Sequence, residues 1–194
     1  MNFLQKIKLR RLLIKHINRP LDINEILSRK SDANVVVDAY EFFMRKYHWK
    51  IDECDSPYAR TFLLCVLYDG EIANGCISQF MTNTCGNYAH QTADALHTIG
   101  ALGAETLLRK SFVLFEGGIV PEDEIVRNNA LDAICKTNTM IELDTVAYNT
   151  DIYNYCYRYL TDNVDIFSSN KQDNWHTTFA YIYLDYAPFG YFFQ

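Results

Sequence analysis

EIANGCISQFMTNTCGNYAHQTADALHTIGALGAETLLRKSFVLF, residues 71–115, is the stretch of sequence that decides the fold. It holds two apolar patterns of helical period, interrupted by polar residues that helices do not favour. Asn74 and Gly75 lie inside an apolar run, and Gln79 and Asn83 follow at intervals of about one turn. Because such residues cost helix stability, their presence indicates a packing contact or a hydrogen bond.

The polar residues of this stretch form the best side-chain constellation in the chain. Glu71 lies one turn from Asn74, and Gln79 lies one turn from Asn83. We expect these side chains to bond each other or to cap a neighbouring helix, and Gly75 to let another helix approach closely. A structural role of this kind is favoured over a ligand site.

Apolar residues recur with helical spacing along most of the rest of the chain. Ser56 is a predicted N-cap with Pro57 at the first helical position. The Asp69-Gly70 pair is predicted to turn or kink the chain, and Gly86 to end the next helix in the left-handed conformation. The predicted helices span 3–17, 34–48, 57–70, 71–81, 88–100, 104–115, 121–135 and 140–160.

These elements predict an all-α protein, a single-domain multi-helix bundle. The length of 194 residues suits one domain, and the 49% hydrophobic fraction excludes a disordered chain. We expect a basic N-terminal helix over 1–20 and one helical domain over 21–194, whose end at 168–194 is an aromatic extension. No stretch is long and apolar enough to cross a membrane.

The charge is distributed unevenly. Residues 1–20 carry six bases and no acid, so the remainder holds 12 bases against 24 acids. An acidic body repels nucleic-acid phosphates and favours a basic protein surface as partner. The acids that we assign to such a partner-binding surface are Glu122, Asp123, Glu124, Asp132, Asp144 and Asp151. An ordinary solvated face is the alternative.

Candidate chemistry is sparse. His90, Asp94 and His97 share one helix face, which could hold a metal or relay a proton, but no third ligand is evident. Cys85 near His90 is the nearest approach to a nucleophile and base. We therefore predict no catalytic residue, no metal site and no cofactor. The six cysteines form no CxxC pair and are expected to be free thiols in a cytoplasmic protein.

The residues from about 57 to 167 resemble the DMP19-like family. EIANGCISQFMTNTCG matches its Glu-x-x-Asn-Gly-Gly-x-x-Gln-Phe-x-x-Asn-x-x-Gly motif, and ADALHTIGA matches the helix that follows. Cys76 stands where the family has its second Gly. The matching signature positions are Glu71, Asn74, Gly75, Gln79, Phe80, Asn83 and Gly86.

The resemblance implies an all-helical fold, and it suggests a function because a characterised member is a dimeric DNA mimic that occupies the DNA-binding surface of a transcriptional regulator. Our leading hypothesis is therefore a non-catalytic acidic interaction protein, acting as such a mimic and forming a homodimer. The alternatives are an immunity- or antitoxin-type inhibitor of a toxin, an enzyme that uses Cys85, His90 or His97, and a protein that self-associates through its aromatic tail.

Overall fold

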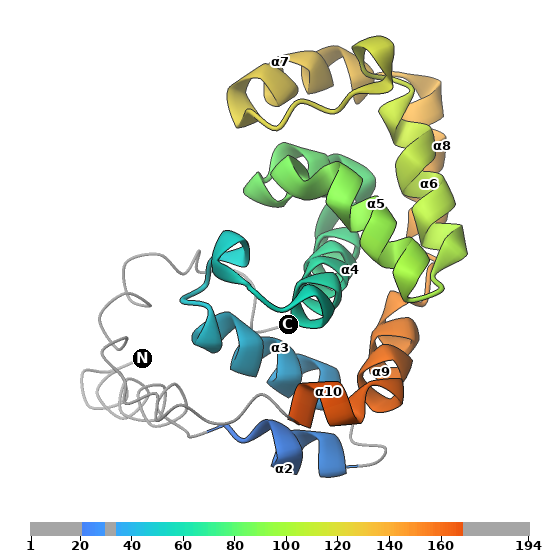
Figure 1. Cartoon of the computed structure of the whole chain (residues 1–194). Coiled ribbons are helices and arrows are strands. Elements are labelled where there is room, and N and C mark those ends of the chain that lie inside the picture. Colours follow the sequence, from blue (N-terminus) through green and yellow to red (C-terminus); the bar gives the residue numbers. More distant parts are fainter. Residues whose placement is uncertain (1–20, 30–33, 169–194) are drawn as a thin grey trace, which may run out of the picture. The chain divides into compact units, whose positions relative to one another are not determined.

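The computed structural model describes residues 21–29 and 34–168. Over these ranges the chain forms α-helices and short 3-10 helices and no strand (Figure 1), which confirms the all-α prediction. From Ile23 onward the described residues belong to one compact unit, Ile23–Asn170. The predicted basic helix of 1–20 lies outside the described residues, as does the aromatic extension apart from Ser168.

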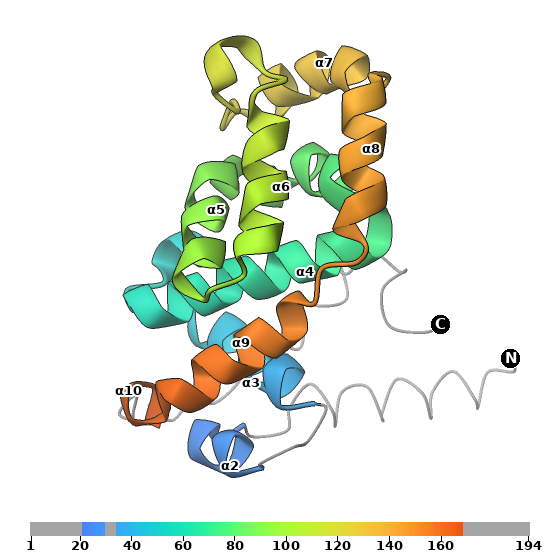
Figure 2. The ribbon, with the colours of Figure 1, turned by 90° about the vertical axis from the view of Figure 1, so that its right-hand side faces the viewer.

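The long helix α4, Pro57–Thr82, is the element on which most of the others pack (Figure 2). Its buried side chains include Phe62, Leu63 and Ile77, none of which has measurable exposure. The helices in contact with α4 are α3 (Val35–Lys46), α5 (Ala89–Thr98), α7 (Glu124–Ile134), α8 (Asn138–Ala147), α9 (Ile152–Asp162) and α10 (Val164–Ser168).

The remaining elements attach to this set. Helix α6 (Leu102–Phe112) packs on α5 and α8, and helix α2 (Ile23–Ser28) packs on α3 and α10. The 3-10 helices are η1 (Ile51–Glu53), η2 (Thr84–Tyr88) and η3 (Glu116–Gly118). None of the helices in the described part of the chain combines the length and the apolar content that a membrane span requires.

Helix α4 begins where the sequence predicts. The Ser56 hydroxyl accepts a hydrogen bond from the Ala59 N–H at 3.3 Å, and Pro57 occupies the first turn. The cap satisfies one of the N–H groups that the first turn of a helix leaves without a partner.

Helix α4 is interrupted at Gly75-Cys76, so the prediction of a turn or kink at Asp69-Gly70 is wrong. Cys76 has φ 68° and ψ −160°, a backbone conformation that is populated almost only by glycine. The helix passes through Asp69-Gly70 because Tyr68 and Ile72, one turn apart, are both buried in the same core.

Contacts on either side of the interruption hold the two parts of α4 together. The rings of Tyr68 and Phe80 meet edge to face at a centroid distance of 4.9 Å. After the interruption, the Ser78 N–H donates to Asp144 Oδ1 of α8 at 3.0 Å, and the Ser78 hydroxyl donates to Asp144 Oδ2. Asp144 thereby caps the second part of the helix in place of a local residue.

Two further sequence predictions need correction. The predicted helix 140–160 is two helices, since Thr137 caps α8 through the Met140 N–H and Asp151 caps α9 through the Asn154 N–H. Gly86 is not in the left-handed conformation. The helix predicted over 34–48 is confirmed by α3.

The strain at Cys76 yields a prediction about stability. Replacing Cys76 by Gly or by Ala removes the thiol in both cases, but only Gly removes the Cβ that opposes this conformation. We expect Cys76→Gly to exceed Cys76→Ala in free energy of unfolding by about 1–3 kcal/mol. Urea denaturation of the two variants measures the difference. Inside an ordinary helix the order would be reversed, so a more stable Ala variant would contradict the strained conformation.

Candidate functional site

The signature residues gather around the interruption of α4 and the end of that helix. Asn83 Nδ2 donates to Glu71 Oε2 at 2.8 Å, although the two residues are 12 positions apart. Asn74 Nδ2 donates instead to the Gly70 carbonyl at 2.8 Å. Two of the four polar side chains therefore bond each other as expected, but Glu71 pairs with Asn83 and not with its nearer neighbour Asn74. The Glu71–Asn83 bond spans the interruption and fixes one part of α4 relative to the other.

Gly75 lies against a side chain of its own helix. A Cβ placed on Gly75 would lie 2.8 Å from Cβ and 3.0 Å from Oε1 of Gln79, which belongs to the same helix. The Gln79 side chain thus folds back over the backbone at the interruption. The three heavy atoms nearest to such a Cβ all belong to α4, so the crowding at this position comes from the helix itself.

Arg127 of α7 is the most deeply buried charged residue that the structure describes, with no exposed surface. Its Nε donates to the Met81 carbonyl at 2.6 Å and its Nη2 to the Asn83 carbonyl at 2.9 Å. Its Nη1 donates to the carbonyls of Pro121 and Glu122 at 2.8 and 2.9 Å. Desolvation lowers the pKa of Arg127 from its ordinary value, but a guanidinium stays charged in proteins.

These contacts make Arg127 a cap for the end of α4. Met81 is in the last turn, where helix carbonyls lack an intrahelical partner and the helix dipole is negative. Gly86 completes the arrangement, because a Cβ there would lie 2.7 Å from Arg127 Nε and 2.8 Å from the Met81 carbonyl oxygen. The guanidinium therefore occupies space that any side chain at position 86 would need.

Cys85 lies within the same arrangement. Its sulfur is 3.4 Å from Glu71 Oε1 and 3.7 Å from the Phe80 carbonyl oxygen. Burial, followed by the charge of Glu71, raises the pKa of the Cys85 thiol to about 12. A thiol of that acidity carries very little thiolate at neutral pH, which is the opposite of what a cysteine nucleophile needs.

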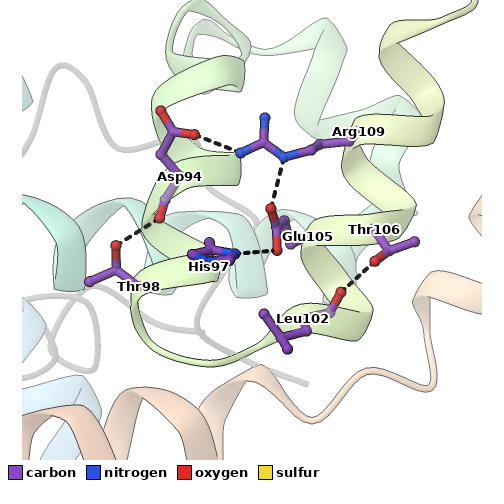
Figure 3. A network of polar contacts seen from close by, with 7 residues as sticks. All are labelled: Asp94, His97, Thr98, Leu102, Glu105, Thr106 and Arg109. Atoms are coloured by element: carbon purple, nitrogen blue, oxygen red, sulfur yellow. Dashed lines mark hydrogen bonds and ion pairs between the residues drawn. The ribbon is translucent and has the colours of Figure 1, made fainter.

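The side chains of the predicted row of His90, Asp94 and His97 have separate partners, and Figure 3 shows those of Asp94 and His97. His97 Nδ1 lies 2.9 Å from Glu105 Oε2, and Asp94 accepts a hydrogen bond from Arg109 at 2.6 Å. His90 Nε2 accepts from the Val120 N–H at 3.2 Å. Within the described residues no group of three or more His, Cys, Asp or Glu side chains could hold a metal ion.

The predicted partner-binding acids fall into two groups. Three serve as hydrogen-bond acceptors inside the fold: Asp123 caps α7 through the Val126 N–H, Asp144 caps the second part of α4, and Asp151 caps α9. Glu122, Glu124 and Asp132 are exposed, on α7 or the segment leading into it. No salt bridge in the described residues involves these last three carboxylates.

Arg127 is the residue that sequence reasoning missed. It is the single basic residue between positions 111 and 135. The sequence feature that could have identified Arg127 is that it is a lone base in an acidic stretch, within a predicted helix.

A half-buried carboxylate lies on α4 near the beginning of α9. Burial, and then the charge of Asp151, raises the pKa of Asp69 to about 6. No hydrogen bond to the Asp69 carboxylate is present among the described residues. Because the folded state binds this proton more tightly than the unfolded state does, the ionised side chain destabilises the fold above pH 6.

The space at Gly86 can be tested by substitution. Gly86→Ala forces a Cβ against the guanidinium and a backbone carbonyl, so we expect a loss of about 1–3 kcal/mol in the free energy of unfolding. Gly70→Ala is the matched control, since a Cβ there meets nothing within 4 Å. In the interior of α4 that control should gain about 0.5–1 kcal/mol. Equal effects in urea denaturation would contradict the packing at Gly86.

Asp69 gives a prediction for pH dependence. Asp69→Asn removes the buried charge, so we expect it to stabilise the protein by about 1–2 kcal/mol at pH 7.5, after discounting for partial exposure. The gain should shrink as pH falls from 6 toward 4, because Asp69 of the wild-type chain then takes up its proton. Denaturation at several pH values measures this, with the exposed Asp132→Asn as control. A gain that is independent of pH would contradict the assignment.

Comparison with known proteins agrees with the signature. The family model described as DMP19-like protein matches residues 55–163, which run from the cap of α4 to the end of α9. No curated protein and no solved structure shows significant similarity to the chain. Since the match covers more than half of the 194 residues and includes every signature position, the chain belongs to the DMP19-like family.

Proposed function

We propose that the chain is a non-catalytic interaction protein that binds a basic protein surface, as a DNA mimic that blocks the DNA-binding surface of a regulatory protein. The observation that carries the proposal is that the acidic side chains on and just before α7 are exposed whereas the basic one is buried. Glu122, Glu124 and Asp132 are exposed, whereas Arg127, the one base nearby in the sequence, is buried. The outward side of α7 therefore presents carboxylates without a neighbouring exposed cation on the same helix.

Carboxylates of this kind can replace phosphates as partners of arginine and lysine. A regulator that binds DNA uses such cations to contact the backbone phosphates. A surface with exposed carboxylates would compete for the same cations, and opposite charges would also speed the encounter. Because the contacts are largely electrostatic, added salt should weaken the complex.

The contacts that the candidate catalytic side chains make support a non-catalytic role. The Cys85 thiol is buried against Glu71, and His90 accepts a backbone hydrogen bond. His97 pairs with Glu105 on the surface of the α5–α6 hairpin. Each of these side chains thus has a structural partner, and they do not lie around a common point.

The proposal also includes a cytoplasmic location and a homodimer. The six cysteines are free thiols, which suits a reducing compartment. Light scattering on the purified full-length chain measures the mass directly, and a monomer at micromolar concentration would remove the dimer from the proposal.

A binding experiment tests the main proposal. Full-length protein is immobilised, exposed to lysate of the source cells, and eluted with a salt gradient, and the retained proteins are identified by mass spectrometry. We expect DNA-binding proteins that leave at moderate salt and are displaced by duplex DNA. The variant Glu124→Gln/Asp132→Asn should lose them, whereas Asp162→Asn/Asp165→Asn, which removes two exposed acids elsewhere, should retain them.

Other results would redirect the proposal. Retention of a single toxin or enzyme that duplex DNA does not displace would favour the inhibitor hypothesis. If the two double variants retained the same proteins equally well, the acids of α7 would not be the residues that bind the partner. If nothing were retained, the proposed function would fail.

A further inference from the structure

Two apolar side chains are exposed at the beginning of α7. Ile125 is 73% exposed and Val126 is 56% exposed, and they are adjacent in the first turn. Single exposed apolar residues are ordinary on protein surfaces, but neighbouring ones within a charged face are characteristic of interaction sites. The acids at this end of the helix have an explanation in capping and the helix dipole, whereas Ile125 and Val126 have none inside the described fold.

The helix has a distinct outward face that includes these residues. Arg127, Leu131 and Ile134 are buried toward the rest of the protein. Ile125 shares the opposite face with Asn129, Asp132 and Ala133, at spacings of four, seven and eight residues, and all of them are exposed. An apolar residue and a carboxylate therefore lie on one exposed stripe, with Glu122 and Glu124 at its beginning.

This surface is held in place before any partner binds. The four hydrogen bonds of the Arg127 guanidinium fix α7 and the carbonyls of Pro121 and Glu122 to the end of α4. Ile125 and Val126 directly precede that anchor. A preformed surface avoids the entropic cost of ordering on binding.

We propose that the outward face of α7 binds a basic amphipathic helix of a partner protein, with Ile125 and Val126 packed against its apolar stripe and the carboxylates facing its lysines or arginines. A basic amphipathic helix fits this surface because its cations would face the acids while its apolar side chains would face Ile125 and Val126. The inference rests on the proposed function and adds to it that apolar contact, in addition to charge, contributes to affinity. Salt should then weaken binding without abolishing it.

Model peptides test this on the full-length protein. The probe is a fluorescent 14-residue peptide of leucine and lysine with the leucines on one helical face. The comparison peptides are a scrambled sequence of the same composition and an oligolysine of equal length. Fluorescence anisotropy at low and high salt measures the affinities.

We expect the amphipathic peptide to bind at least about tenfold more tightly than the scrambled one, which is about 1.4 kcal/mol. Ile125→Ser/Val126→Ser should remove that advantage. Ile141→Ser/Val146→Ser is the matched control, because these apolar residues of α8 are also exposed, at 53% and 51%, and it should bind like the wild type. Circular dichroism and thermal denaturation verify that both variants are folded.

The outcomes separate the inference from the proposed function. If the two leucine-lysine peptides bind equally, or if Ile125→Ser/Val126→Ser binds like the wild type, the inference is overturned. If oligolysine still binds and Glu124→Gln/Asp132→Asn weakens it, the proposed function stands without the apolar contact. If none of the peptides binds, both fail.

Discussion

The buried guanidinium of Arg127 is the interaction on which the rest of the signature region depends. Removing a charge from water costs several kcal/mol unless hydrogen bonds compensate, and here four backbone carbonyls do so. Two of them lie at the end of α4, where the helix dipole is negative, and two lie in the segment entering α7. Displacing either segment would leave a buried cation with only two of its four hydrogen-bond acceptors, so α4, Gly86 and α7 are fixed together.

The interruption within α4 must also be stabilised by contacts from outside the helix. Breaking a helix leaves N–H and carbonyl groups without intrahelical partners, and residues distant in sequence supply them. Asp144 accepts from the Ser78 N–H after the break. A separate bond between side chains, from Asn83 to Glu71, spans the break. The signature is thus best understood as the set of residues that lets one long helix bend and end in a defined way.

Sequence periodicity located most helices correctly, because helices such as α3 and α5 bury one regular stripe of mainly apolar residues. It failed where tertiary contacts outweigh local signals. Asp69-Gly70 has turn chemistry, yet burial of its helical neighbours carries α4 through it, and the break falls on Cys76 instead. Within the site, Glu71 and Asn83 were predicted to belong to a set of polar side chains that bond each other, but the sequence did not indicate which members pair. Arg127 was missed since its acceptors include backbone carbonyls 44 and 46 positions away, which leave no side-chain pattern.

A count of acids overstates the charge that a partner could engage. Asp123, Asp144 and Asp151 accept hydrogen bonds that cap helices, so engaging a partner's cation through them would compete with the fold. Of the six acids predicted to bind a partner, the three that cap no helix (Glu122, Glu124 and Asp132) lie on or beside α7, the helix that Arg127 anchors. Because that anchor points inward, its positive charge is kept from the surface while it holds the negative face still. The burial of Arg127 therefore stabilises the end of α4 and also leaves the exposed face of α7 negatively charged.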